Sequence, residues 1–261
     1  MSIAVLGPLR AQINGADAEL SGVKLRGVLA VLALRAGQDV RRDELIEELD
    51  LTRTTGDAVN AVHAHVRRLR RWLKEHGMQA DVLETVNSGY RLNVDRHAVD
   101  AHRFRHLVEQ GLNLAPTTPS VVAAILEEAL SLWRSEALTD TLHGAMTVAA
   151  AEELRQWRTS ARDALLDAWL ALDQNHKVIL HAPKFIADDP LNESLCARHI
   201  AALHRVGRCA EAVQSYRDTE RTLRQELGVE PGVELRTAYG LATHSMPPDA
   251  LRERIELSQL S

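Results

Sequence analysis

The stretch "VHAHVRRLRRWLKEHG" at residues 62–77 decides the fold, because it places an apolar and a basic face on one predicted helix. Apolar residues recur alternately three and four places apart, which is the spacing of a single helical stripe. Asp57 is a suitable N-cap and Gly77 a suitable stop, so the helix is predicted between them. The stripe comprises Val59, Val62, Val66, Leu69 and Leu73. The opposite face comprises Asn60, Ala64, Arg67, Arg68 and Arg71, with His63 and Lys74 at its flanks.

This basic face has three possible roles: a metal site, a solvated surface or a surface that binds a polyanion. His63 and His65 are two residues apart, so on a helix their side chains point about 160° apart around the axis. They therefore cannot chelate one metal ion. Solvated helices usually mix charges of both signs so that neighbours pair. Residues 67–74 instead hold four arginines and one lysine but no acidic residue, and the first acidic residue after them is Glu75. The pattern therefore favours a polyanion, and Asn60 is the residue type that pairs bidentately with adenine.

The flanking sequence supplies the rest of a DNA-binding fold. Residues 81–94 contain two strand-like runs around Asn87-Ser88-Gly89, which indicates a hairpin. Two further helices are predicted at 24–37 and 41–50. Short apolar pieces separated by Gly-Pro and Asn-Gly predict a leading antiparallel meander at 3–6, 11–13 and 18–20. Three helices followed by a hairpin make a winged helix-turn-helix, whose third helix enters the DNA major groove.

Composition and charge are consistent with a two-domain, mainly helical protein of 261 residues. Aromatic residues make up only 3%, which argues against an all-β fold. The net charge of −5 is unevenly placed: residues 1–96 hold 14 basic and 13 acidic residues, and the remainder holds 17 and 23. The two cysteines, Cys196 and Cys209, suggest reduced thiols. The longest apolar run, 28–34, is too short to span a membrane, so we expect a cytoplasmic protein.

The second half of the chain is predicted to be all helical. Two helix-turn-helix units can be overlaid with an offset of about 32 residues, close to the period of tetratricopeptide repeats. Such helical repeats usually form binding surfaces. We therefore predict a winged helix-turn-helix domain with small β elements at 1–95 and an all-α, tetratricopeptide-like domain at 96–261. One helix-turn-helix unit runs through Leu172, Asn175 and the helix from His176. The other runs through Leu203, Gly207, Ala210, Ala212 and Tyr216.

Seven stretches carry a resemblance to a known family. They are "VLGPLRAQINGADAEL" (5–20), "KLRGVLAVLALRAGQDVRRDELIEEL" (24–49), "VHAHVRRLRRWL" (62–73), "SGYRL" (88–92), "VDAHRFRHLV" (99–108), "ALSLWRSEAL" (129–138) and "DDPLNESLCARHIAALHRVGRCAEAVQSYRDTERTLRQELGVEPGVEL" (188–235). The N-terminal part resembles the OmpR-type winged helix. The whole chain resembles the Streptomyces antibiotic regulatory protein family of transcriptional activators, which join that winged helix to a helical bacterial transcriptional activator domain.

The resemblance implies a function and a set of partners. Two molecules would bind side by side on direct repeats of promoter DNA overlapping the −35 element. They would recruit RNA polymerase through its sigma and alpha subunits and so activate a biosynthetic gene cluster, in the cytoplasm and in association with the nucleoid. Phosphorylation of a receiver domain is not expected, because no such domain precedes the winged helix.

The resemblance also implies roles for individual residues. The recognition helix would present Asn60, His63, Ala64, Arg67 and Arg68 to the groove, and Arg71 and Lys74 to the DNA backbone. Further contacts from the wing and to the backbone would come from Lys24, Arg26, Asn87, Ser88 and Arg91. The loop at 50–56 matches the polymerase-contacting loop and would use Arg53, Thr54 and Thr55. This loop has Asp50-Leu51 and Thr54-Thr55 where relatives usually carry Trp-Gly and Pro-Pro.

We therefore predict a DNA-binding transcriptional activator that is not an enzyme and needs no cofactor or metal. The alternative is a tetratricopeptide-like module that binds a protein or a ligand and whose DNA-binding function has degenerated. A steep loss of DNA affinity with salt would separate the two, since a genuine DNA binder releases counterions from the phosphates.

Overall fold

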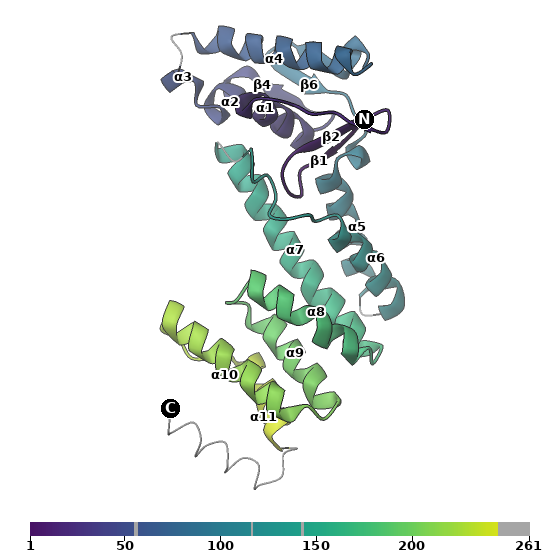
Figure 1. The fold of residues 1–261 in the computed structure, drawn as a ribbon, viewed down its shortest axis with the longest axis vertical. Coiled ribbons are helices and arrows are strands. Elements are labelled where there is room, and N and C mark those ends of the chain that lie inside the picture. Colours follow the sequence, from purple (N-terminus) through teal and green to yellow (C-terminus); the bar gives the residue numbers. More distant parts are fainter. Residues whose placement is uncertain (55–56, 116, 142–143, 245–261) are drawn as a thin grey trace. The chain divides into compact units, whose positions relative to one another are not determined.

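The computed structural model describes residues 1–54, 57–115, 117–141 and 144–244, and it is mainly helical with two small antiparallel sheets (Figure 1). The described chain forms two compact units. The first unit consists of Met1–Gln110 and Ile125–Ala161, and the second of Gly111–Ala124 and the chain from Arg162 onward. Within these ranges, no helix is both long and apolar enough to cross a membrane.

The predicted N-terminal meander is present. Strands β1 (Ser2–Ala4), β2 (Arg10–Ile13) and β3 (Ala16–Asp17) pair antiparallel in that order. The β2–β3 turn consists of Asn14 and Gly15, both with positive φ (53° and 80°), which is the geometry that an Asn-Gly hairpin turn requires. The third strand therefore begins earlier than the expected apolar piece at 18–20.

The winged helix-turn-helix follows with three short elements that the sequence had not indicated. Its elements are α1 (Val23–Leu34), β4 (Asp39–Arg41), α2 (Arg42–Glu48), α3 (Leu51–Thr54), α4 (Ala58–Glu75), the 3-10 turn η1 (Ala80–Val82), β5 (Leu83–Val86) and β6 (Gly89–Leu92). The three unexpected elements are β4, α3 and η1. Strand β4 adds to the hairpin to give the order β4-β6-β5. The segment expected to be a loop at 50–56 contains the short helix α3, so the loop prediction is wrong for residues 51–54.

The core of the winged helix lies beneath α4. Helix α1 is buried from Gly27 to Ala33, and α4 packs against both α1 and α2. Figure 1 shows α4 lying across these two helices with β6 beside it. Gly89 begins β6 so close to β4 that a Cβ atom there would lie 1.9 Å from the Val40 carbonyl oxygen. Only glycine therefore permits this strand pairing.

Beyond the winged helix and the 3-10 turn η2 (Arg96–Ala98), the chain forms α5 (Asp100–Leu114), α6 (Pro119–Ser131) and α7 (Ala145–Ala171). The first unit includes these helices only up to Gln110 and from Ile125 to Ala161. The chain around 134–141 returns to the β1–β2 turn, where the Arg134 amide donates to the Leu6 carbonyl at 2.9 Å. The Asp100 carboxylate accepts from the Val5 and Leu6 amides at 2.7 and 3.1 Å. Residues far apart in the sequence thus share one core.

Glu48 of α2 caps α7 from a buried position. Its carboxylate is only 3% exposed and accepts hydrogen bonds from the amides of Gly144, Met146 and Thr147 at 3.2, 2.7 and 3.1 Å. The Thr147 hydroxyl donates to the same carboxylate. A negative charge satisfies the free amides at a helix start and interacts favourably with the helix dipole. Helix α7 therefore begins directly against the winged helix.

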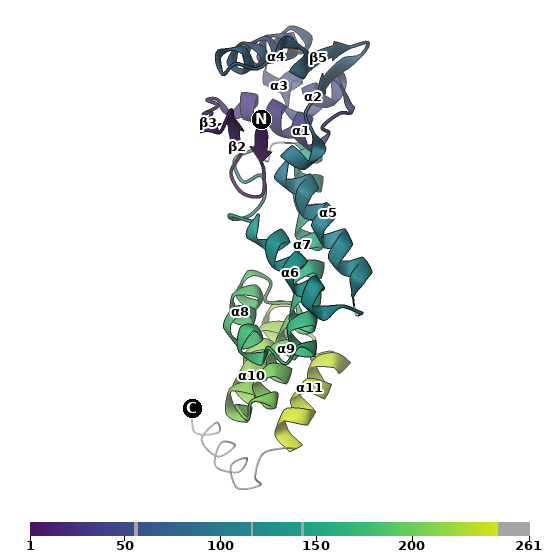
Figure 2. The same ribbon diagram turned by 90° about the vertical axis from the view of Figure 1, so that its right-hand side faces the viewer.

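The second unit contains the predicted helical hairpins, visible in Figure 2 as α8 (Asn175–Asp188), α9 (Glu193–Arg205), α10 (Cys209–Glu226) and α11 (Val233–His244). Helix α9 contacts the other three. Gly207 has φ 77° in the α9–α10 turn, and Tyr216 stacks on Tyr239 with ring centroids 4.1 Å apart.

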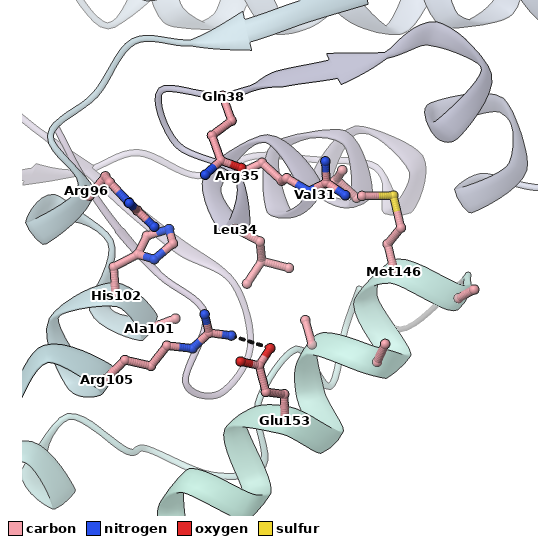
Figure 3. Close-up of a pocket in the computed structure, with 13 residues that line it drawn as sticks. Val31, Leu34, Arg35, Gln38, Arg96, Ala101, His102, Arg105, Met146 and Glu153 are labelled. Carbon is pink, nitrogen blue, oxygen red and sulfur yellow. Dashed lines mark ion pairs between the residues drawn. The ribbon is translucent and has the colours of Figure 1, made fainter. Parts of the chain in front are cut away.

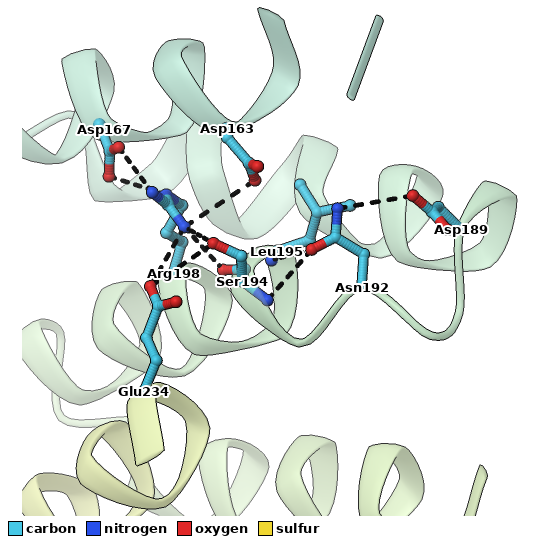
Figure 4. Close-up of polar contacts among 8 residues, drawn as sticks. All are labelled: Asp163, Asp167, Asp189, Asn192, Ser194, Leu195, Arg198 and Glu234. Atoms are coloured by element: carbon cyan, nitrogen blue, oxygen red, sulfur yellow. Dashed lines mark hydrogen bonds and ion pairs between the residues drawn. The ribbon is translucent and has the colours of Figure 1, made fainter. Parts of the chain in front are cut away.

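Arg198 joins three helices of this unit (Figure 4). It forms a bidentate pair with Asp167 of α7 at 2.7 Å and contacts Glu234 of α11 at 3.3 Å. Its third carboxylate neighbour, Asp163, lies at 3.8 Å. Burial raises the pKa of Asp163 to about 6, because its partial desolvation outweighs the attraction of Arg198.

Candidate nucleic-acid interface

Helix α4 begins as the sequence predicts. The Asp57 side chain accepts the Asn60 amide at 3.0 Å and so caps the first turn. The Asn60 side-chain amide also donates to Asp57, while Asn60 itself is exposed. A bidentate contact of Asn60 with adenine would therefore exchange this local hydrogen bond for one with DNA.

The buried face of α4 matches the predicted stripe except at its start. Val62, Val66, Leu69 and Leu73 are buried, whereas Val59 is 39% exposed because it lies in the first turn, beyond the core. The stripe gains a member, Trp72, which is 7% exposed and donates through Nε1 to the Glu19 carbonyl at 2.8 Å. An amphipathic indole suits this position, since its ring packs and its N–H finds a partner.

The opposite face carries the cations. Arg67, Arg68, Arg71 and Lys74 are all exposed, and within the described ranges none of them forms a hydrogen bond or an ion pair. His63 and Ala64 lie half-buried on the same helix. Four unpaired cations on one helix are costly to keep together without an anionic partner, because like charges at neighbouring helical positions repel. The face is therefore suited to phosphates and guanine edges.

His65 lies between the basic and the buried faces. Burial lowers its pKa, and the positive charges of Arg68 and Lys24 lower it further. The imidazole is consequently neutral at physiological pH and adds no charge to the basic face.

Arg70 has a structural role that the sequence did not reveal. Its guanidinium donates to the Leu83 carbonyl at 3.0 and 2.9 Å and to the Thr85 hydroxyl at 2.7 Å. It also lies 6.0 Å from the Tyr90 ring centroid. Arg70 thus fastens α4 to the hairpin. The only local signal was its position beside the apolar stripe, between Leu69 and Leu73.

The predicted wing residues separate into two groups. Asn87 and Ser88 are exposed at the tip of the β5–β6 hairpin, and the Ser88 carbonyl accepts the Arg42 amide at 2.9 Å. Arg91 lies on β6 and pairs with Asp39 at 2.6 Å and with Glu84 at 3.8 Å. The charge of Arg91 is thus shared with two carboxylates, unlike the cations of α4.

The two basic residues of α1 also have internal partners. Lys24 donates to the Leu49 carbonyl at the end of α2. Arg26 pairs with Asp140 at 3.3 Å and donates to the Leu20 carbonyl at 3.4 Å. Asp140 in turn accepts the Leu9 amide at 2.8 Å, so Arg26 belongs to the network that holds the β1–β2 turn.

Two of the predicted polymerase-contacting residues, Arg53 and Thr54, belong to α3. Arg53 is 83% exposed and its nearest carboxylate is that of Asp50 at 3.9 Å. Thr54 is the last residue of α3. Thr55 lies outside the described residues. Arg53 is therefore presented on a helical turn next to the start of α4.

Comparison with known proteins agrees with this geometry. The family described as "Transcriptional regulatory protein, C terminal" matches residues 19–92, and that described as "Bacterial transcriptional activator domain" matches residues 99–240. The chain is 34% identical over 242 residues to the transcriptional regulator RedD of Streptomyces coelicolor, covering 92% of this chain and 69% of RedD. It is 31% identical over 242 residues to the regulatory protein DnrI of Streptomyces peucetius, covering 90% and 89% respectively.

A solved structure shares the same architecture. The structure of Mycobacterium tuberculosis EmbR in complex with a low-affinity phosphopeptide superposes with a TM-score of 0.85 at 28% sequence identity. The match covers 97% of this chain and 67% of the EmbR chain. Together with the two domain matches and the two regulators above, it confirms the resemblance seen in the sequence. The chain belongs to the Streptomyces antibiotic regulatory protein family of DNA-binding transcriptional activators.

Proposed function

We propose that this protein binds direct repeats near the −35 element of a promoter, as two molecules side by side, and recruits RNA polymerase to a secondary-metabolite gene cluster. The observation that carries the proposal is the exposed row of Arg67, Arg68, Arg71 and Lys74 along α4, which has no internal counter-charge in the described structure. A helix of this kind followed by a hairpin docks in the major groove. Membership of a family of DNA-binding transcriptional activators supports the promoter context, and the similarity to RedD and DnrI supports the proposed link to a secondary-metabolite cluster.

Within this proposal the residues of α4 divide by position. Asn60, His63, Ala64, Arg67 and Arg68 face the base edges, whereas Arg71 and Lys74 hold phosphates. Asn87 and Ser88 approach the adjacent groove from the tip of the wing. Lys24, Arg26 and Arg91 serve only as backbone contacts, because each already donates to an internal carbonyl or carboxylate.

The polymerase contact is assigned to the turn at the end of α3. Arg53 there is nearly free of internal contacts, so it is available to an acidic surface of a sigma or alpha subunit. Thr54 and Thr55 are assigned to the same polymerase contact. We assign DNA binding to a domain at 1–95 and the activator function to a domain at 96–261.

Footprinting on promoter DNA, with and without RNA polymerase holoenzyme, tests the proposal. We expect protection of spaced direct repeats beside the −35 element, strengthened by the holoenzyme. Repeats protected to the same extent in both conditions would refute the polymerase contact but not DNA binding. No protection in either condition would refute the proposal and favour a protein- or ligand-binding module.

A further inference from the structure

A cavity of about 510 Å³ lies within the first unit, away from α4 (Figure 3). Helix α1 forms one wall, η2 and α5 form a second, and the first turns of α7 form a third. No residue of α4 or of the wing contributes to its lining. Its volume lies in the range of small-molecule sites. The cavity is therefore separate from the residues assigned to DNA contact.

The floor of the cavity is apolar. Figure 3 shows Leu34 reaching into the space between α5 and α7, with Met146 on the α7 side. These surfaces would cover a hydrophobic ring or chain and remove it from water. The remaining apolar lining consists of Val31, Ala101, Ala145, Ala149 and Ala150.

The rim of the cavity is cationic. Arg35, Arg96 and Arg105 line it together with a single acidic residue, Glu153. Arg105 pairs with Glu153 at 2.5 Å, whereas Arg96 forms no ion pair within the described ranges. Arg35 has its partner outside the cavity, Glu44 at 3.7 Å. The cavity thus holds more positive than negative charge.

Two further groups on α5 add polar capacity to this rim. The Arg105 Nε atom is buried and has no hydrogen-bond acceptor in the described structure. A buried donor without an acceptor costs free energy. Because Nε is closed to solvent, a ligand would contact the rest of the Arg105 guanidinium group, whose side chain is partly exposed. His102 contacts the Ala33 carbonyl through Nε2 at 3.2 Å, and burial together with the charges of Arg96 and Arg105 lowers its pKa. His102 is consequently neutral, so the cationic character comes from the arginines.

We propose that this cavity binds a small organic anion with an apolar body, whose acidic group lies between Arg96 and Arg105 and whose body packs on Leu34 and Met146. Guanidinium groups pair with carboxylates and other oxyanions through charge-assisted hydrogen bonds, which a neutral ligand cannot form. An organic cation would be repelled by three arginines. This inference does not rest on the proposed promoter function, because it concerns a different set of residues.

Two matched probes separate charge recognition from hydrophobic binding. The full chain is titrated with 1-anilinonaphthalene-8-sulfonate and with uncharged N-phenyl-1-naphthylamine, which have the same aromatic body. Fluorescence and calorimetry report affinity and stoichiometry. We expect one sulfonate molecule per chain, bound at least about tenfold more tightly than the neutral probe. Decanoate, an apolar chain with a carboxylate, should displace it.

Variants locate the site. Arg96→Gln and Arg105→Gln should each weaken the sulfonate probe about tenfold and leave the neutral probe unchanged. Ala149→Phe should weaken both probes, because Ala149 is an exposed helical residue whose enlargement fills the cavity. The control is Arg103→Gln on the same helix, since Arg103 pairs with Glu128 at 2.6 Å and lies outside this cavity.

The outcomes are decisive because Arg96 forms no ion pair in the described parts of the chain, so Arg96→Gln breaks no such contact there. Wild-type affinity in both Arg96→Gln and Arg105→Gln would overturn the proposal. Equal affinity of the two probes, or no binding of either, would overturn it as well. A loss of sulfonate binding in Arg103→Gln alone would place the probe in the smaller cavity beside β1, which Arg103 lines, and would likewise refute the assignment.

Discussion

At the scale of single residues, the unpaired arginines of α4 make DNA binding sensitive to individual substitutions. Arg67→Ala and Arg68→Ala should each weaken binding to the operator by about 1–3 kcal/mol. Arg71→Ala should weaken binding to all sequences alike and reduce the slope of log affinity against log salt by about 1, as loss of one phosphate contact requires. Electrophoretic mobility shifts at several salt concentrations measure both effects.

The matched control is Arg221→Ala, an exposed arginine of α10 that pairs with Asp218 at 3.1 Å within its own helix. It removes the same charge from the chain without touching α4. If the Arg67→Ala variant and the Arg68→Ala variant both bind with wild-type affinity, α4 is not the recognition helix. An equal loss in Arg221→Ala would show that net charge alone determines binding.

Asp163 gives the second unit a pH-dependent stability whose sign follows from its raised pKa of about 6 against an ordinary 3.8. The folded state holds the proton more tightly than the unfolded state. The unfolding free energy therefore falls as pH rises from about 4 to about 6. Above about pH 6 it stays at this lower level, because the buried carboxylate is then charged. Asp163→Asn should be more stable than wild type at pH 7, with the difference vanishing near pH 4. Urea unfolding at both pH values measures it.

Asp167→Asn, at another carboxylate that contacts Arg198, should change the stability at pH 7 in the opposite direction. It removes one half of the bidentate pair at 2.7 Å, so it should lower the unfolding free energy at pH 7. If Asp163→Asn also proves less stable at pH 7, the attraction between Asp163 and Arg198 outweighs the burial of the carboxylate, and the sign argued here is wrong.

At the scale of elements, the wing depends on a single glycine. Gly89→Ala would place a methyl group 1.9 Å from the Val40 carbonyl oxygen, so β4 and β6 must separate. We expect a loss of at least about 1–3 kcal/mol in unfolding free energy, together with faster amide exchange in β4 and β6. Thermal unfolding and hydrogen exchange measure these effects.

Gly240→Ala is the control with the opposite expected sign. Gly240 lies in α11, and no atom of the described residues would lie within 4 Å of an added Cβ. Alanine should therefore stabilise the helix by about 0.5–1 kcal/mol. A Gly89→Ala variant as stable as wild type would show that the hairpin accommodates a side chain, and the close pairing of β4 and β6 would not be essential.

Elements with a strong local pattern could be predicted from the sequence, and those made by distant partners could not. The stripe of α4 and the Asn14-Gly15 turn are encoded by periodicity and turn chemistry, which are local. Strand β4 is three residues long and exists because it pairs with β6, about 50 residues away. The helical period predicted that Val59 is buried, yet its side chain is exposed, because none of the described elements covers the first turn of α4 there.

The same distinction applies to the candidate interface. The sequence placed Arg67, Arg68, Arg71 and Lys74 on one face, and they are exposed there. It could not show that Arg26 pairs with Asp140 or that Arg91 pairs with Asp39, since both partners are distant in the chain. Arg70 looked equivalent to its neighbours, yet its donors are taken by Leu83 and Thr85. Charge patterns predict a face, whereas internal partners decide which cations remain available.

At the scale of the whole molecule, the winged helix shares its core with the chain that follows it. The Val5 and Leu6 amides donate to Asp100, and the Glu48 carboxylate accepts from the start of α7. All these contacts lie within the first unit, which extends to Ala161. A fragment ending at residue 95 would retain the DNA-contacting helix but lose every one of these partners. Buried polar groups without partners are destabilising.

We therefore expect a fragment of residues 1–95 to be markedly less stable than a fragment of residues 1–161. Glu48→Ala in the longer fragment should lower the unfolding free energy by about 1–3 kcal/mol, because three amides at the start of α7 lose their acceptor. Glu47→Ala is the matched control, because Glu47 is the preceding residue of the same helix and its side chain is exposed. Urea unfolding followed by circular dichroism measures each variant. Equal midpoints for the two fragments would show that the winged helix is energetically independent, and the Glu48 cap would then serve only to orient α7.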